Sequence, residues 1–214
     1  MKKYISALSA ALALVLTTSA AHAELLGNGD FESALAPANT VPEGNFSVFL
    51  GPQGPFGDVA SIDPNNGVSH LDIGLIDSPE SFVGIQQLVT GIIAGEAYDF
   101  SLFARTEGFT DVGAEVRIEF QDSDGVEISR TDNGDFSLLN GTTYNQFGQF
   151  GAIAPTGATQ AIAVFASASF NGGTGNGRFF IDDASFVGPT AIPEPASAGL
   201  LALALTGLVA RRRR

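Results

Sequence analysis

Hydrophobic and polar residues alternate along the central part of the chain with the period of two that is typical of half-buried β-strands. In the stretch from Glu115 to Phe120, the even-numbered residues are apolar and share one face, while the odd-numbered residues are charged and share the other. Residues 98–102 and 162–166 repeat this alternation. No eleven-residue window between residues 24 and 188 shows helical periodicity, so strands are expected throughout this region.

Turn residues separate the alternating runs, for example Asp124-Gly125 and the glycine-containing stretches 155–157 and 171–173. About eight or nine short strands at this spacing predict an all-β sandwich or jelly roll. An apolar fraction of 44%, with 17 Phe, supplies one hydrophobic core, and 26 Gly and 10 Pro fit a chain with many turns. We therefore expect a single β-sandwich domain over residues 24–188.

The first 23 residues have the organisation of a secretory signal peptide. Two lysines precede an apolar stretch over residues 5–16, and small residues follow as far as Ala21-His22-Ala23. This A-x-A ending predicts cleavage after Ala23, so that the mature chain begins at Glu24. The apolar run is short for a membrane anchor, and the sequence thus predicts an exported protein.

The C-terminal end has three consecutive parts: Pro193-Glu194-Pro195, an apolar run from Ala196 to Ala210, and four arginines ending at Arg214. A helix of this apolar run is about 22 Å long, which is short for a hydrocarbon core of roughly 30 Å. The arginines favour a cytoplasmic C-terminus, with the preceding domain on the opposite side of the membrane. An ordinary anchor behind a proline-rich stalk is the alternative interpretation.

In this order, the three parts of residues 191–214 resemble the PEP-CTERM sorting signal of Gram-negative bacteria that make extracellular polysaccharide. The resemblance implies an exosortase as partner, a membrane cysteine protease-transferase that recognises Pro193, Glu194 and Pro195 and cuts near them. It also implies that the protein crosses the inner membrane transiently through a short apolar C-terminal helix. The domain would face the periplasm before processing and then reach the cell surface or the extracellular space.

The region between the two ends is strongly acidic and has no cysteine. From Glu24 to Thr190 there are four arginines, no lysine and 22 acidic residues, which gives a formal charge of −18. This charge disfavours nucleic acid as a partner and favours divalent cations such as Ca²⁺, although solubility alone explains most of the acidic residues. The absence of cysteine excludes disulfides, cysteine-ligated metals and thiol catalysis.

Several segments of the domain resemble, in order, the galactose-binding-like jelly rolls, which include several carbohydrate-binding modules. LLGNGDFES at 25–33 and GRFFIDDASF at 177–186 look like the bracketing strands of that family, and segments 87–105, 120–125 and 142–159 continue the pattern between them. The resemblance implies a single galactose-binding-like jelly roll. The stretch from Val41 to Pro64 is looser and looks like an insertion or a long loop.

The family resemblance implies a structural Ca²⁺ shared by Glu32 and Asp182. On the last strand the even-numbered residues from Phe180 to Phe186 share one face, so Asp182 is expected to point inward, where a carboxylate needs a metal or strong hydrogen bonds. Asp183 would then face outward and be the weaker ligand unless a bulge shifts the register. The alternative is that Asp182 accepts hydrogen bonds from backbone amides near a turn.

Aromatic residues for sugar stacking are scarce, because the chain has no Trp and the domain has two Tyr. Tyr98 lies in a core-patterned strand and is expected to be buried. Tyr144 occupies a place where relatives often carry Trp and is the possible ligand contact, with a structural role as its alternative. Phenylalanines in loop-like stretches, which either line a surface or plug the fold locally, are Phe46, Phe49, Phe56 and Phe109.

No catalytic motif accompanies this domain. G-x-S-x-G, H-E-x-x-H and phosphate loops are absent from the sequence, and His70, the one histidine of the mature chain, fits a strand better than a base. No catalytic or organic-cofactor residue is therefore nominated, and we expect a non-catalytic cell-surface or matrix protein that binds glycan. The alternatives are a structural or adhesive matrix component and, less favoured, a small glycoside hydrolase with paired carboxylates.

Overall fold

The computed structural model describes residues 22–51, 56–61, 64–75, 82–110, 112–134, 141–169 and 176–189. In these ranges the regular elements are all β-strands. Most of the signal peptide and the whole sorting tail, with Pro193, Glu194 and Pro195, lie outside the described residues. Among the residues that are described, no helix has the length and apolar character needed to cross a membrane.

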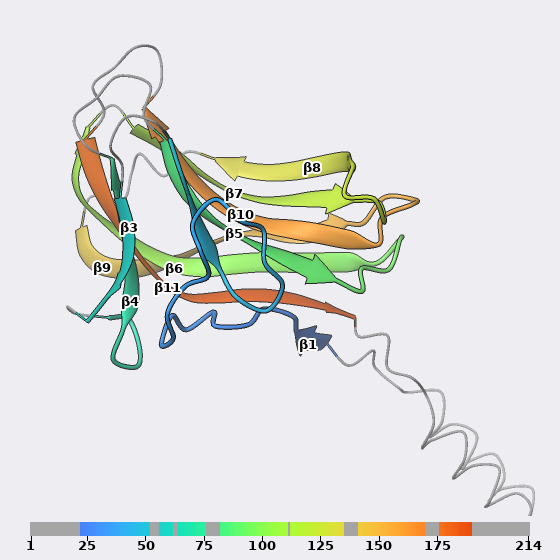
Figure 1. Ribbon diagram of the computed structural model, residues 1–214, viewed down its shortest axis with the longest axis horizontal. Coiled ribbons are helices and arrows are strands. Elements are labelled where there is room, and N and C mark those ends of the chain that lie inside the picture. Colours follow the sequence, from blue (N-terminus) through green and yellow to red (C-terminus); the bar gives the residue numbers. More distant parts are fainter. Residues whose placement is uncertain are drawn as a thin grey trace, which may run out of the picture.

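The strands form two antiparallel sheets that lie one over the other (Figure 1). The first sheet has the order β3 (Phe56–Ala60), β4 (His70–Leu75), β11 (Asn176–Pro189), β6 (Ala97–Thr110) and β9 (Gly141–Ile153), with β1 (His22–Glu24) also paired to β11. The second sheet has the order β2 (Ser47–Leu50), β5 (Phe82–Thr90), β10 (Gln160–Ser169), β7 (Val112–Gln121) and β8 (Glu127–Gly134). This two-layer arrangement confirms the predicted all-β sandwich.

The core lies between the sheets and is built from the apolar sides of the alternating strands. Val116, Ile118 and Phe120 are fully buried in it, as their period-two pattern predicts. The ring of Phe165 on β10 meets the ring of Phe179 on β11 edge to face, with centroids 5.3 Å apart, which ties one sheet to the other. Tyr98 is also fully buried, as expected, and its hydroxyl accepts a hydrogen bond of 2.7 Å from the backbone N–H of Ile93.

A bulge in β11 breaks the alternation that the sequence suggests for this strand. The pairing of β11 with β6 slips between Asp182 and Ser185, and Asp183 has a φ of 47°. Phe179 and Ile181 join the core before the bulge, and Ala184 and Phe186 join it afterwards. The prediction of one inward face from Phe180 to Phe186 is therefore wrong, because Phe180 and Asp182 lie on the outer side of the sheet.

The N-terminal segment covers the open edge of β2. The backbone N–H of Ala36 donates to the carbonyl of Phe46 (2.8 Å), and that of Asn39 donates to the carbonyl of Val48 (2.7 Å). These contacts satisfy polar groups that an edge strand otherwise leaves open. The stretch from Val41 to Pro64, expected to be an insertion or a long loop, contributes an edge strand to each sheet, β2 and β3.

Candidate functional site

Asp182 is a fully buried carboxylate that holds the connection between β3 and β4. Its Oδ2 accepts hydrogen bonds from the backbone N–H groups of Asn65 (2.9 Å) and Asn66 (3.1 Å), and its Oδ1 accepts one from Asp183 (2.8 Å). Burial raises the pKa of Asp182 from 3.8 to about 6, because the loss of hydration outweighs the three N–H donors that stabilise the charged form.

Glu32 holds the same connection two residues further along. Its Oε1 accepts hydrogen bonds from the backbone N–H groups of Val68 (2.6 Å) and Ser69 (2.9 Å). Gly67 permits this approach, because a Cβ there would lie 2.1 Å from the same Oε1, and its φ of 63° is one that glycine adopts readily. Asp183 adds a contact from its Oδ2 to the side-chain amide of Asn65 (2.8 Å).

These contacts bear on the calcium site that the family resemblance implies. The carboxylate oxygens of Glu32 and Asp182 accept hydrogen bonds from backbone N–H groups. A Ca²⁺ site needs such oxygens to point together at the ion, with further oxygen ligands around it. In the described ranges, no group of three or more His, Cys, Asp or Glu residues is placed to hold a metal ion. As they stand, the contacts match the alternative of backbone-amide bonding and do not form a calcium cage. Calcium binding stays a prediction.

Tyr144 lies on β9 at the outer side of the first sheet, where it packs against a buried arginine. The guanidinium carbon of Arg105 lies 5.4 Å from the centroid of the Tyr144 ring and 3.9 Å from that of Phe180. Arg105 also forms an ion pair of 2.8 Å with Glu107. His70, the first residue of β4, is fully buried with its ring 5.4 Å from Phe180. This stack joins β9, β6, β11 and β4, which gives Tyr144 a packing role.

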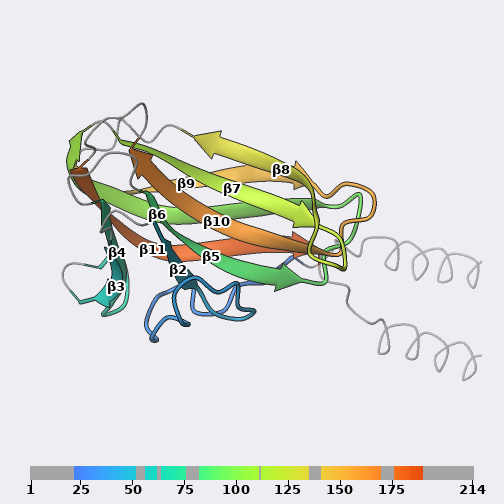
Figure 2. The same cartoon turned by 45° about the horizontal axis from the view of Figure 1, so that its top comes forward.

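The outer side of the second sheet has a different character, and we call it the β10 face. Figure 2 shows β8, β7, β10 and β5 side by side in front of the first sheet. The register of the strands places on this face Phe49, Phe82, Gly84, Gln86, Ile162, Val164, Ala166, Glu115, Arg117, Glu119, Glu127, Arg130 and Asp132.

An apolar strip follows β10 along the middle of this face. Ile162 and Val164 point away from the core, yet their exposed fractions are 8% and 1%. Val164 stands opposite Gln86 of β5 and Arg117 of β7. The long side chains of the neighbouring strands therefore lie against the strip, with their polar ends fixed beside it.

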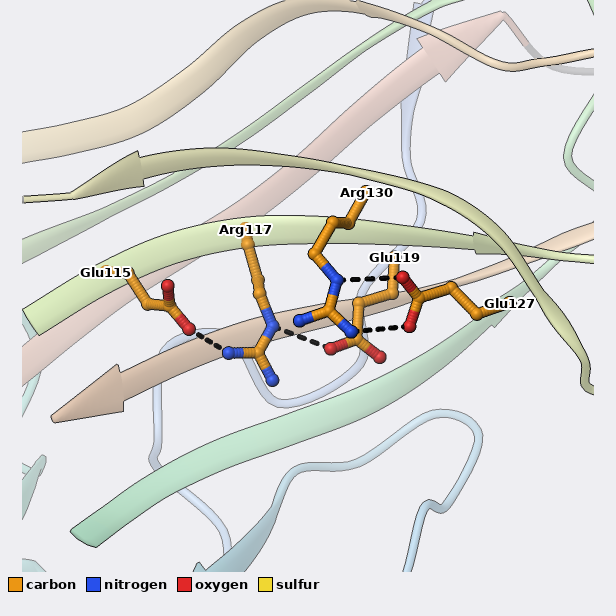
Figure 3. A network of polar contacts seen from close by, with 5 residues as sticks. All are labelled: Glu115, Arg117, Glu119, Glu127 and Arg130. Atoms are coloured by element: carbon orange, nitrogen blue, oxygen red, sulfur yellow. Dashed lines mark hydrogen bonds and ion pairs between the residues drawn. The ribbon is translucent and has the colours of Figure 1, made fainter. Parts of the chain in front are cut away.

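Charged residues of β7 and β8 form an ion-pair network beside the strip (Figure 3). Arg117 pairs with Glu115 and, through its Nε, with Oε1 of Glu119 at 2.6 Å. Arg130 pairs in bidentate fashion with Glu127, at 2.7 Å and 2.6 Å. Bidentate and shared ion pairs hold guanidinium and carboxylate groups in defined orientations, so the donors and acceptors of this network are preorganised.

Two phenylalanine rings border the opposite side of the face. Phe49 stands opposite Gly84, and a Cβ at Gly84 would lie 2.2 Å from Cζ of Phe49, so the ring lies over the glycine. The ring of Phe82 is 6.4 Å from that of Phe49, and Phe82 is 41% exposed. Phe49 thus faces outward from an edge strand. Phe46, from the same set of sequence candidates, is buried in the core.

Small residues separate the aromatic border from the charged one. Gly84 stands opposite Ala166, and Ala166 stands opposite Glu115. Three strand spacings of about 4.8 Å place roughly 14 Å between the strand that carries Phe49 and the strand that carries Glu115. Little of the apolar strip is exposed, so the face offers aromatic rings at one side and hydrogen-bonding groups at the other, with small residues between them.

Sequence reasoning identified the shared face of Glu115, Arg117 and Glu119 but missed its partners. Phe82 was not singled out, and Ala166 was identified only as part of an alternating strand, because their proximity depends on the pairing of β5 with β10 and of β10 with β7. The available signal was the spacing of Phe82 and Gly84, which are two residues apart and therefore lie on the same side of a strand. It indicates a common face but does not reveal which strand lies beside it.

The family model of the PEP-CTERM protein-sorting motif matches residues 191–214, which confirms the sorting tail predicted from the sequence. This motif indicates an exported protein that is processed at the membrane. The match covers the tail and leaves the β-sandwich unassigned. No curated protein matches the sequence.

Solved structures resemble the β-sandwich. The enzymatically active domain of tailspike protein 4 of bacteriophage CBA120 has a TM-score of 0.57 and 15% identity, over 76% of this chain and 21% of that one. The CBM22-1 xylan-binding domain of Paenibacillus barcinonensis Xyn10C has a TM-score of 0.52 and 12% identity, over 81% of this chain and 99% of that one. A CBM4 structure has a TM-score of 0.52 and 14% identity, over 76% and 98%. The chain therefore has the β-sandwich fold of carbohydrate-binding modules.

Proposed function

We propose that this chain is an exported, non-catalytic glycan-binding protein that an exosortase-type system sorts to the cell surface or extracellular matrix. The observation that carries the proposal is the β10 face, on which the aromatic pair Phe49 and Phe82 and the network around Arg117 border one apolar strip. The β-sandwich fold of carbohydrate-binding modules supports it.

The chemistry of this face suits a sugar chain. Pyranose rings have apolar C–H faces, which pack against aromatic rings such as Phe82. Their hydroxyl groups donate to carboxylates and accept from guanidinium groups, and the network of Glu115, Arg117 and Arg130 supplies both kinds of partner. Because the ion pairs already fix these side chains, binding costs little additional side-chain entropy.

The sorting motif explains how such a domain reaches polysaccharide. The motif begins at residue 191, two residues after β11 ends at Pro189. In our proposal the tail holds the domain at the periplasmic side of the inner membrane until an exosortase-type protease-transferase cuts it. The domain then binds extracellular polysaccharide.

The proposal is tested by measuring the binding of the mature chain, from Glu24 onward, to a panel of soluble polysaccharides in mild detergent. We expect binding to at least one glycan, with a large loss of affinity for Phe82→Ala and for Phe49→Ala. Phe150→Ala is the matched control, because Phe150 is 59% exposed on β9 of the other sheet. If Phe150→Ala loses as much glycan affinity as Phe82→Ala and Phe49→Ala, the ligand does not bind specifically at the β10 face.

The two rival functions predict different outcomes of the same experiment. A structural or adhesive matrix component without a small-molecule site shows no binding to any member of the panel. A glycoside hydrolase releases new reducing ends from one of them, and its turnover disappears when a single acidic residue such as Glu115 or Glu119 is changed to Gln. A stable complex without new reducing ends supports the non-catalytic function.

A further inference from the structure

The arginines of the β10 face are already neutralised by acidic side chains. Arg117 is shared between Glu115 and Glu119, and Nε and Nη2 of Arg130 both donate to Glu127. Asp132 stands opposite Arg117 on β8 and adds a further carboxylate. The face therefore carries two positive and four negative charges and is locally acidic.

The other positively charged residues of the domain are also paired with acidic side chains. Of its four arginines, Arg105 and Arg178 lie on the first sheet, where they pair with Glu107 and Asp72. The sequence from Glu24 to Thr190 has no lysine and a formal charge of −18. A negatively charged ligand is thus repelled over the whole approach as well as at the face.

Carboxylates accept hydrogen bonds and donate none when ionised, so an acidic face binds ligands that supply donors. The hydroxyl groups of a neutral sugar supply them. A uronate or sulfate group supplies acceptors and a negative charge, and the carboxylates of Glu115, Glu119 and Glu127 beside the guanidinium groups repel it.

From this charge arrangement, and resting on the proposed function, we infer that the β10 face selects uncharged glycans and excludes polysaccharides that carry uronic acid or sulfate groups. This selectivity depends on the charge of the ligand and not on its sugar sequence. It is therefore measurable before the natural glycan is known.

The experiment compares acidic polysaccharides with their carboxyl-reduced forms, in which each uronic acid is converted to the neutral sugar. The probes are glucuronoxylan, alginate and polygalacturonate, each beside its reduced counterpart, with the mature chain from Glu24 onward. We expect binding to a reduced form to be about tenfold tighter than to its parent, a factor that corresponds to about 1.4 kcal/mol. This difference should be large near 0.01 M salt and small near 1 M salt, where the Debye length falls from about 30 Å to about 3 Å.

Variants connect the selectivity to this face. Glu115→Gln and Glu127→Gln each remove one negative charge beside the arginines. We expect each variant to lower the ratio of the affinity for a reduced polysaccharide to the affinity for its acidic parent. Glu96→Gln is the matched control, because Glu96 is an exposed acid in the turn before β6 and lies outside the face. It removes the same formal charge from the domain, and near 0.15 M salt, where the Debye length is about 8 Å, it should leave the ratio of the two affinities nearly unchanged.

Each result separates the inference from the function on which it rests. Parent polymers that bind as tightly as their reduced forms at low salt overturn the inference and leave glycan binding in place. A preference that Glu96→Gln narrows as strongly as Glu115→Gln overturns the assignment to the β10 face. Absence of binding to every parent and every reduced form counts against both the inference and the proposed function.

Discussion

Ala23 lies directly opposite Gly188 in the pairing of β1 with β11. The predicted signal-peptide cleavage site thus falls inside a strand of the folded domain, and its partner strand leads into the sorting motif. Gly188 packs closely on the buried ring of Tyr98, since a Cβ there would lie 2.2 Å from that ring. The two ends of the domain are therefore held side by side.

This pairing predicts that removal of the signal peptide precedes folding. A peptidase needs an extended, accessible substrate, and β1 in the folded precursor is paired with β11. We expect purified folded precursor to resist signal peptidase and urea-unfolded precursor to be cut to a chain beginning at Glu24, as measured by N-terminal mass spectrometry. Leu25→Pro removes the N–H that donates to the Phe186 carbonyl (2.9 Å) and should make the folded precursor cleavable. Equal cleavage of folded and unfolded wild-type precursor would contradict this order.

The sorting tail predicts a second cut near the other end. The match to the PEP-CTERM motif covers residues 191–214, and an exosortase-type enzyme is proposed to cut near Pro193. We expect mass spectrometry of the native protein to find a C-terminus near Pro193, and Glu194→Ala to leave the tail in place. A native chain that still ends at Arg214 would argue against processing.

Asp182 predicts a pH dependence of stability with a definite sign. Its pKa is about 6 in the folded chain against an ordinary 3.8, so between these values the folded state binds more protons than the unfolded state. Its contribution to stability is fully present below pH 3.8 and is lost as the pH rises through 6. A shift of this size corresponds to about 3 kcal/mol.

Urea unfolding at pH 4.5 and pH 7 measures this contribution. Repulsion among the many acidic residues of the domain also lowers the free energy of unfolding at higher pH. The pH dependence of the wild-type protein alone therefore does not identify the contribution of Asp182. Asp182→Asn removes the titrating group, and we expect it to show a smaller loss between the two pH values than the wild-type protein. Parallel losses would show that Asp182 does not titrate in this range.

Calcium at Glu32 and Asp182, as the family resemblance implies, is tested by thermal unfolding with calcium and with chelator. If the free calcium concentration is a hundred times the Kd of the site, binding stabilises the fold by about 2.7 kcal/mol and raises the Tm. Glu32→Gln should abolish that increase, and Glu96→Gln, at an exposed acid in the turn before β6, should preserve it. A Tm that calcium leaves unmoved would assign both carboxylates to the backbone amides of residues 65, 66, 68 and 69 alone.

Local patterning predicted much of the fold, because a strand records burial in its own alternation. Val116, Ile118 and Phe120 face the core as their spacing indicates. The bulge after Asp182 could not be predicted in the same way, because it depends on one aspartate adopting a φ of 47° under contacts from a distant loop. Hydrogen bonds between segments more than a hundred residues apart leave no periodic signal in either segment.

The candidate site divides along the same line. The charged side of the β10 face was visible as the alternation of Glu115, Arg117 and Glu119, since these residues share one strand. The aromatic side was not visible, because Phe49 and Gly84 come together through the pairing of β2 with β5. Sequence resemblance instead nominated Tyr144, which lies on the other sheet.

Tyr144 supplies the prediction that best separates packing from ligand binding. Its ring is one of two that pack on the guanidinium group of Arg105, beside that of Phe180, and the Arg105 side chain is 4% exposed, so removing the ring exposes part of a buried charge. We expect Tyr144→Ala to lower the free energy of unfolding by about 1 to 3 kcal/mol. Tyr144→Phe, which keeps the ring, should cost much less. Glycan affinity of the folded fraction should be unchanged in both variants, in contrast to Phe82→Ala. A Tyr144→Ala variant of wild-type stability and lost glycan binding would move the ligand site to the first sheet.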